Sequence, residues 1–442
     1  MTRQDTQSAG HSNWLKSTAL YLLIVILSCT AVEGGSWAVL KIYQDYFSYH
    51  SKVTSDNKSP EGALKFISDP AIIRDFYKYN ENIYTFESYL MYKNAPFASK
   101  YFNVDKNGVR SNGHPAAGAK APGKTIWIFG SSALFGSPNV ADNETIAAQL
   151  ETVLNEGNKL GEPVRVVNYG THGYVSFQDL IYLNFLLLDD RPDLIIVHNG
   201  NNDLGNTDVR QHRFVHRQLR YLWGMHQEQR LVNWNAASTM VRRAFSNTIQ
   251  LIGKMRKFLD WSAAKSDLEG WKQAYLEKAA ERSKPYRHAL DEQVSFYIEN
   301  MRSIVQLAER HNVPVVLSPQ PNLLVSSKKL VGQEISTFEL TTKEYFAASK
   351  DDILALKTVP TYRIHQGDVR DFPAFQAAYR SMATRLLADC RAKRLACIDT
   401  QPVLDIHDGE PMFYDTVHLT YHGNRIVAEA LADQVVSVLQ PN

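Results

Sequence analysis

Five short apolar runs constrain the fold more than any other feature of this sequence. They lie at residues 125–129, 164–167, 194–197, 313–317 and 395–398. Amphipathic stretches separate or follow them, at residues 144–154, 176–188, 291–311, 372–393 and 425–439. Short apolar strands that alternate with helices are typical of parallel sheets covered by helices on both faces. The pattern therefore predicts an α/β domain, in a chain long enough to bury a large core.

Polar motifs follow the first four apolar runs directly. They read Gly-Ser-Ser at 130–132, Asn-Tyr-Gly-Thr-His-Gly at 168–173, Gly-Asn-Asn-Asp at 200–203 and Ser-Pro-Gln-Pro at 318–321. Ligands of open parallel sheets bind outside the carboxyl ends of the strands, where these motifs fall. The sequence therefore predicts a functional site at that edge of the sheet.

A turn that carries an acid and a base lies just ahead of the last amphipathic stretch. Asp415 stands three residues before His418, so its carboxylate can hold one imidazole nitrogen while the other acts as a base. The alternative interpretation is a helix cap with an incidental histidine.

The remaining candidates for chemistry come from the strand-end motifs. Ser132 is the candidate nucleophile, although a serine after a strand is more often a turn residue or helix cap. Asn202 can donate its amide to a developing oxyanion, or it can simply stabilise its own loop. The backbone N–H of Gly173 is a second candidate donor. Gly170 competes with it, and a plain turn role is open for both glycines.

Several other kinds of site have no support in the sequence. No Gly-x-Ser-x-Gly elbow occurs at the first run, and the chain has no His-Glu-x-x-His or Cys-x-x-Cys motif. No Gly-x-Gly-x-x-Gly follows the first run, so we expect no dinucleotide cofactor. Because the zinc-site motif is missing too, we expect no metal. The formal net charge of +2 does not favour a nucleic-acid partner.

The four motifs at 130–132, 168–173, 200–203 and 415–418 resemble, in order, the sequence blocks of the SGNH (GDSL-type) hydrolases. The resemblance covers roughly residues 125–440. It implies a flavodoxin-like, three-layer α/β/α fold without a cofactor.

The same resemblance implies roles for individual residues. Ser132, His418 and Asp415 would form the catalytic triad, and the Ser132 N–H, the Gly173 N–H and the Asn202 side chain would surround the oxyanion. One departure is Ser131, which stands where the family usually has Asp. We expect a structural hydrogen bond to be lost there, and the choice between adjacent serines rests on register, which favours Ser132.

The N-terminal part predicts a membrane anchor. Residues 17–40 are apolar apart from Glu33 and follow Arg3 and Lys16, which favours a cytoplasmic tail at 1–16 and a domain outside the cytoplasm. A cleaved or lipidated N-terminus and a buried helix are the alternatives. Residues 41–118 are interpreted as a juxtamembrane segment that packs on the hydrolase domain at 119–442.

The three cysteines leave the redox state open. Cys29 lies in the apolar N-terminal run. Outside the cytoplasm Cys390 and Cys397 can pair, and two buried thiols are the other interpretation.

A large insertion, predicted to be helical, occupies about residues 204–290. Between Arg210 and Lys257 it contains ten Arg or Lys residues and one acidic residue, with Trp223, Trp234 and Phe245 among them. This composition suits a lid that contacts an anionic polysaccharide, a lipid headgroup region or an acidic protein. A solvated basic hairpin with an apolar core face is the alternative.

Together these features predict a membrane-anchored, extracytoplasmic serine esterase that cleaves O-acyl esters, most plausibly O-acetyl groups on a glycan. The second hypothesis is an O-acyltransferase that uses the same residues on a cell-envelope or exported polysaccharide. It would work beside a membrane acyltransferase or a polysaccharide assembly complex. The third is a non-catalytic glycan-binding assembly subunit, which Ser131 alone supports.

Overall fold

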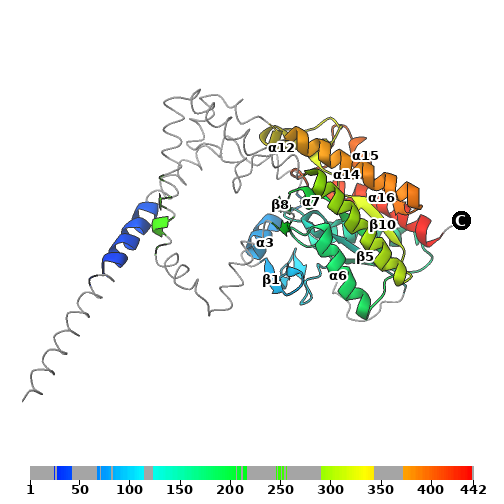
Figure 1. The fold of residues 1–442 in the computed structure, drawn as a ribbon, viewed down its shortest axis with the longest axis horizontal. Coiled ribbons are helices and arrows are strands. Elements are labelled where there is room, and N and C mark those ends of the chain that lie inside the picture. The colour runs from blue at the N-terminus through cyan, green and yellow to red at the C-terminus, as the bar shows by residue number, and fades with distance from the viewer. Residues whose placement is uncertain are drawn as a thin grey trace, which may run out of the picture. The chain divides into compact units, whose positions relative to one another are not determined.

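The computed structural model describes residues 24, 27–41, 67–69, 71–80, 83–113, 123–205, 207–210, 213–216, 245, 247–249, 251–252, 255, 290–342 and 372–440. The chain divides into two compact units. The first comprises residues 1–59, 228–276 and 345–362, and the second comprises residues 60–227, 277–344 and 363–442. The sheet, whose strands β5 and β10 are labelled in Figure 1, and all the candidate site residues belong to the second unit.

The second unit is built on a five-stranded, fully parallel sheet with the order β11-β10-β7-β5-β6. The strands are β5 (Lys124–Gly130), β6 (Val164–Asn168), β7 (Leu194–Asn199), β10 (Val315–Pro319) and β11 (Ala396–Cys397). Numbered along the chain, their order is 2-1-3-4-5, which is the flavodoxin-like order. All five predicted strands are present, and the predicted parallel sheet is confirmed.

Alternate side chains of β5 enter two separate hydrophobic clusters, one on each face of the sheet. Ile126 and Ile128 join the cluster of α5 (Ile146–Glu156) and α16 (Tyr421–Leu439). Trp127 and Phe129 join the opposite cluster. That cluster contains α6 (Ser176–Asp189), the helix at residues 290–310 and α14 (Phe372–Lys393). Because both faces are apolar, helices cover both, which gives three layers (Figure 1).

Two helices begin at a hydroxyl cap rather than where periodicity predicts. Helix α5 starts at Ile146, because Asp142–Glu144 forms a 3₁₀ turn and the Thr145 hydroxyl accepts the Ala148 N–H. Helix α16 starts at Tyr421, four residues earlier than predicted, because the Thr420 hydroxyl accepts the Gly423 N–H. The second cap places His418 directly before the entrance of α16.

Residues 67–113 pack against the α/β core through a buried arginine. They contain α3 (Ala71–Asn80) and two antiparallel strand pairs: β1 (Tyr84–Glu87) with β2 (Met91–Asn94), and β3 (Phe97–Ala98) with β4 (Asn103–Val104). The Arg110 Nε donates to Asp142 at 3.0 Å, and its terminal nitrogens donate to the Phe135, Gly136 and Val140 carbonyls at 2.6–3.0 Å. The guanidinium also stacks on Phe102. Arg110 therefore fixes the turn that follows β5.

The described start of the predicted helical insertion is a strand pair, so that part of the prediction is wrong. After the short helix α7 (Asn201–Gly205), β8 (Thr207–Arg210) pairs in antiparallel fashion with β9 (Arg213–His216). Thr207, Val209, Phe214 and Val215 are β-branched or aromatic, and such residues favour strands. Most of residues 217–289, including Trp223 and Trp234, lies outside the described residues.

The first unit contains a helix at residues 27–41, so the predicted span at 17–40 is described only in part. Among the described residues, the structure contains no helix with the length and apolar character that a membrane crossing requires. The Glu33 carboxylate accepts the N–H groups of Asn247 and Thr248 at 2.6 and 3.1 Å, and Ser36 bonds to the Thr248 hydroxyl.

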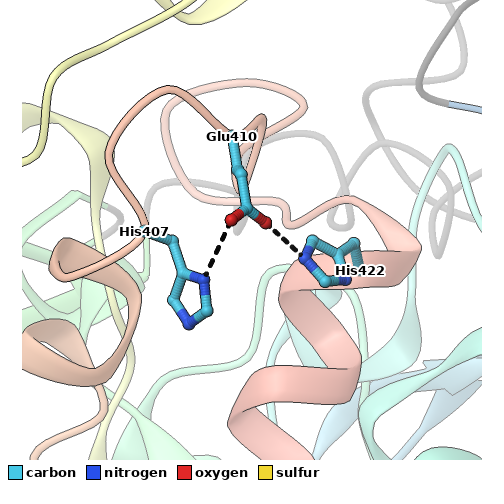
Figure 2. A group of neighbouring side chains, drawn as sticks. All are labelled: His407, Glu410 and His422. Carbon is cyan, nitrogen blue, oxygen red and sulfur yellow. Dashed lines mark hydrogen bonds and ion pairs between the residues drawn. The ribbon is translucent and has the colours of Figure 1, made fainter.

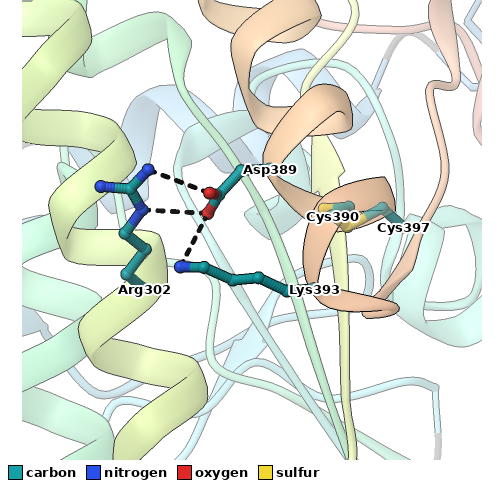
Figure 3. Close-up of a disulfide and its surroundings, with 5 residues drawn as sticks. All are labelled: Arg302, Asp389, Cys390, Lys393 and Cys397. Carbon is teal, nitrogen blue, oxygen red and sulfur yellow. Dashed lines mark hydrogen bonds and ion pairs between the residues drawn. A yellow bond between two sulfur atoms is a disulfide. The ribbon is translucent and has the colours of Figure 1, made fainter.

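Cys390 and Cys397 form a disulfide that joins the end of α14 to β11 (Figure 3). The interpretation as two separate thiols is therefore wrong. Beside the disulfide, Arg302 makes a two-point contact with Asp389 at 2.9 and 3.0 Å, and Lys393 lies 3.2 Å from the same carboxylate. These contacts tie α14 to the helix at residues 290–310.

A buried ion pair anchors the chain just before the predicted acid–base turn. Glu334, in α12 (Gln333–Thr342), accepts the Met412 and Phe413 N–H groups at 2.9 Å through one oxygen. Its other oxygen lies 2.5 Å from the Lys328 ammonium, and both side chains are fully buried. A buried charge must be paired, so this pair holds residues 412–413 in place.

We predict that Glu334→Ala lowers the free energy of unfolding by about 3–5 kcal/mol, because it leaves the Lys328 ammonium buried without a counter-charge. Urea denaturation measures the loss. Combining Lys328→Met with Glu334→Gln should recover part of the stability lost in Glu334→Gln alone. A loss below about 1 kcal/mol in Glu334→Ala contradicts this role.

Candidate active site

Ser132 begins a short helix, α4 (Ser132–Phe135), directly after the carboxyl end of β5. Ser131 before it is buried and has extended backbone, which turns the chain from strand into helix. Leu134 and Phe135 are fully buried and anchor the helix, and Arg110 binds the carbonyls at its end. The Ser132 side chain is thereby held half-buried at the edge of the sheet.

Ser132, His418 and Asp415 form a continuous chain of hydrogen bonds. The His418 Nε2 lies 2.9 Å from the Ser132 Oγ, across 286 positions of sequence, and its Nδ1 lies 2.7 Å from the Asp415 Oδ2. An ionised carboxylate only accepts, so Nδ1 carries the ring proton and Nε2 accepts the serine hydroxyl. The structure thus brings together the three residues expected to form the triad.

Asp415 is held ionised by its hydrogen bonds. Burial raises the pKa of the carboxyl, but the His418 ring and the Val417 and His418 N–H groups outweigh it, and the net pKa lies below the usual value. A carboxylate in this state fixes the imidazole tautomer and stabilises an imidazolium when His418 takes a proton.

The acid and base lie at the tip of a short antiparallel hairpin. Phe413 bridges Leu419, the Tyr414 N–H donates to the His418 carbonyl at 2.8 Å, and the Thr420 N–H donates to the Met412 carbonyl at 3.0 Å. The hairpin is fixed by Glu334 at its start and by the α16 cap at its end, so the His418 ring is aimed by rigid elements.

The oxyanion candidates lie on the loops after β6 and β7. The Asn202 Nδ2 donates to the Tyr174 carbonyl at 3.0 Å, which ties this amide to the loop that contains Gly173. Gly173 has a φ of 75°, which favours glycine. A side chain at Gly170 would place its Cβ 2.5 Å from the Phe135 nitrogen, so Gly170 is required for packing against α4.

Two buried residues of β2 hold the Gly170–Tyr174 loop, and the sequence reasoning missed both. The Asn94 amide donates to the Gly170 carbonyl at 2.8 Å and to the Gly108 carbonyl at 3.0 Å. The Tyr92 hydroxyl donates to the His172 carbonyl at 3.0 Å. The Tyr92 ring also packs against the Tyr174 ring, and the Tyr174 hydroxyl donates to the Tyr92 carbonyl. The short β2 strand shows no sequence signal for these distant partners.

Gln320 connects the nucleophile turn to the acid–base turn and was also not predicted. The Ser131 hydroxyl donates to the Gln320 Oε1 at 3.1 Å, and the Gln320 Nε2 donates to the Val417 carbonyl at 3.2 Å. The expected loss of a hydrogen bond at Ser131 therefore does not occur. The polar motif after the fourth apolar run was the available signal for this residue.

His172 forms a second, buried serine–histidine pair. Its Nε2 lies 2.5 Å from the Ser137 Oγ, and the ring packs against Phe135 with centroids 4.3 Å apart. Burial, with smaller contributions from the His418 and Arg110 charges, holds the pKa of His172 well below its usual value. The ring is therefore neutral, and its Nδ1 faces the Asn94 amide oxygen at 3.5 Å rather than a carboxylate.

Within the described residues, Ser132, Asp415 and His418 are each partly buried. The His418 side chain keeps 17% of its surface exposed. A cavity of about 730 Å³ lies between β3, β4 and residues 141–144, and none of the triad residues lines it.

No family model matches the sequence, and a search of curated proteins finds no match. Solved structures do match, at low identity and low TM-score. A GDSL-like lipase from Bacteroides thetaiotaomicron is 12% identical with a TM-score of 0.33, over 71% of this chain and 88% of that one. A lipase/acylhydrolase from Enterococcus faecalis is 13% identical with a TM-score of 0.35, over 72% and 99%.

An acetylxylan esterase from Geobacillus stearothermophilus, solved as a catalytic mutant, is 13% identical with a TM-score of 0.32, over 71% of this chain and 94% of that one. Matches at this level carry no argument about activity.

We predict that Asn94→Ala lowers kcat for ester hydrolysis by about tenfold to a hundredfold with little change in KM, because the loop that carries Gly173 loses its buried anchor. Steady-state kinetics on folded protein measure the effect. Lys93→Ala, one residue away, serves as the matched control and should leave kcat unchanged. An unchanged kcat in Asn94→Ala would show that the β2 contact does not position the loop.

A buried carboxyl beside Asn202 makes stability depend on pH. Burial raises the pKa of Asp203 to about 7, although the Ser176 N–H and hydroxyl donate to it. The folded state therefore holds this proton more tightly than the unfolded state. Protonated Asp203 contributes its full stabilisation below the ordinary aspartate pKa near 4, which applies in the unfolded state. This stabilisation is lost as the pH rises towards 7.

We predict that the titration of Asp203 makes the free energy of unfolding fall between about pH 4 and about pH 7. The contribution of this group to the slope reaches at most about 1.4 kcal/mol per pH unit. In Asp203→Asn the slope should be smaller. Urea denaturation of both proteins at a series of pH values measures it, and equal slopes would show that Asp203 does not titrate in this range.

Proposed function

We propose that this chain is a serine esterase of the SGNH type that cleaves O-acyl esters. The observation that carries the proposal is the hydrogen-bonded chain from the Ser132 Oγ through His418 to Asp415 at the carboxyl edge of the sheet. A serine hydroxyl bonded to an imidazole that a carboxylate orients is the arrangement that activates serine as a nucleophile.

Acylation starts when the Ser132 Oγ attacks the ester carbonyl and His418 takes the hydroxyl proton. Asp415 stabilises the resulting imidazolium through Nδ1–H. His418 then gives the proton to the leaving alkoxide, and the acyl group stays on Ser132 as an ester. Water, deprotonated by the same imidazole, attacks the acyl-enzyme. As the tetrahedral intermediate collapses, the bond to the Ser132 Oγ breaks, His418 returns the proton to that oxygen and the acid is released.

Three donors would stabilise the tetrahedral oxygen in both steps. The Ser132 N–H lies at the start of α4, and Gly173 and Asn202 follow the two neighbouring strands β6 and β7. Asn202 donates one amide hydrogen to the Tyr174 carbonyl, and its side-chain amide carries a second hydrogen. Such donors act in place, without reorganisation during the reaction.

The proposed substrate is an O-acetyl ester on a glycan outside the cytoplasm. The His418 side chain is partly exposed, and the Cys390–Cys397 disulfide suits an oxidising compartment. The basic, aromatic composition between Arg210 and Lys257 suits contact with an anionic polysaccharide. We keep the apolar stretch at residues 17–40 as the proposed membrane anchor.

O-acyl transfer is the second candidate, because the same acyl-enzyme is resolved by a sugar hydroxyl wherever that hydroxyl outcompetes water. A membrane acyltransferase or a polysaccharide assembly complex would then supply the acyl group. The non-catalytic glycan-binding subunit is the third candidate, and it rests on Ser131 alone, whose hydroxyl donates to Gln320.

We predict that Ser132→Ala and His418→Ala each lower kcat/KM for aryl acetates and acetylated glycans by at least about three orders of magnitude. Asn202→Ala should cost about two to three orders, mainly in kcat. Acetate release from purified full-length protein measures the loss, and Ser295→Ala on an exposed helix face is the control. Ester turnover that survives in both triad variants contradicts the proposal.

The same incubation separates hydrolysis from transfer. Acetyl donor and a deacetylated glycan are mixed with the enzyme, and mass spectrometry follows free acetate and acetylated glycan. Release of acetate alone identifies an esterase, whereas growth of acetylated glycan identifies an acyltransferase.

A further inference from the structure

Three side chains outside the triad converge beside the base of the hairpin that carries Asp415 and His418 (Figure 2). His407 and Glu410 lie in the loop after α15 (Gln401–Asp405), and His422 lies in the first turn of α16. The Glu410 carboxylate stands between the two rings, 3.5 Å from the His407 Nδ1 and 2.8 Å from the His422 Nε2. One ligand atom of each residue lies within 4.8 Å of the other two.

We propose that His407, Glu410 and His422 bind a divalent transition-metal ion, with Zn²⁺ as the best-fitting cation. Two imidazoles and a carboxylate suit zinc and its first-row neighbours, whereas Mg²⁺ and Ca²⁺ prefer oxygen ligands throughout. The ion takes the place of the protons that the rings share with Glu410. Because the three side chains keep 24–50% of their surface exposed, water completes the coordination.

The distances fit a tetrahedral zinc site after small side-chain rotations. Zinc bonds of 2.0–2.2 Å place neighbouring ligand atoms about 3.3 Å apart. The two separations that involve Glu410, 2.8 and 3.5 Å, lie on either side of this value. These two separations run to different carboxylate oxygens. For one ion, the two ring nitrogens and a single carboxylate oxygen, which lie within 4.8 Å of one another, must move closer together, and all three side chains are partly exposed.

The backbone already holds the three residues in place. The Glu410 N–H donates to the His407 carbonyl at 3.3 Å and so closes the turn between these two ligands. On the other side, the Thr420 hydroxyl donates to the Pro411 carbonyl at 2.9 Å, which fixes the residue after Glu410 to the cap before His422. Little ordering is therefore needed on binding, and this favours affinity.

The ion would cross-link the loop after α15 to the start of α16, while the hairpin between them presents Asp415 and His418. It would act as a structural clamp on the segment that carries the acid and the base, without taking part in ester chemistry. The sequence predicted no metal because the ligands follow no zinc spacing motif, and the fold brings His422 to the other two.

The test uses full-length protein stripped with a chelator and then dialysed. Calorimetric titration with ZnCl₂ should give one equivalent of bound zinc that His407→Gln, Glu410→Gln and His422→Gln each weaken by at least about tenfold. Zinc should raise the thermal unfolding midpoint by several degrees in the wild type and not in these variants. Glu309→Gln, an exposed carboxyl elsewhere, should behave as the wild type.

His418→Gln distinguishes this site from zinc held by the triad, and it should retain the equivalent that His422→Gln loses. Co²⁺ in place of zinc gives a visible absorption band that reports coordination, and the band should vanish in His422→Gln. The proposal is overturned if the wild type binds no zinc at micromolar concentration. It also fails if the bound equivalent survives in the Glu410 and His422 variants or disappears only in His418→Gln.

Discussion

The candidate site depends on one constraint, namely that all five strands of the sheet run in the same direction. Both faces of the sheet are sealed by apolar helices, so the carboxyl edge is where polar groups can gather. Ser132 follows β5, Gly173 follows β6, Asn202 follows β7 and Gln320 follows β10. Parallel pairing brings these four loops together although they are far apart in sequence.

Buried polar contacts then set the geometry that the sheet alone leaves open. Arg110 holds the turn after the nucleophile, Asn94 holds the loop that carries Gly173, and Glu334 holds the hairpin that carries His418. Each of these side chains is buried, so a misplaced loop would leave a charge or an amide without a partner at a cost of several kcal/mol. The same residues therefore contribute both stability and alignment.

The sequence predicted the features that depend on local patterns. Apolar runs marked β5, β6, β7 and β10 to within about two residues, because burial on both faces leaves a continuous signal. The spacing of Asp415 and His418 indicated the acid and the base, because the two residues are only three positions apart in the sequence. The contact of His418 with Ser132 followed only from the resemblance to a family.

Features that depend on distant partners could not be predicted. Nothing in the four residues of β2 indicates that Asn94 bonds to Gly170, and nothing near Ser131 indicates Gln320. Helix α16 extends to Tyr421 because Thr420 caps it, which periodicity does not detect. The β8–β9 pair lies at the start of the insertion predicted to be helical, and its β-branched and aromatic residues favour strands instead.

The central claim is that His418 makes one serine hydroxyl of this chain a nucleophile. Reaction of the full-length protein with a fluorophosphonate, followed by intact mass and peptide mapping, tests it most directly. The account predicts a single adduct on Ser132 that forms far more slowly when His418 is replaced. An adduct on Ser131 or Ser137, or a labelling rate that does not depend on His418, would contradict it.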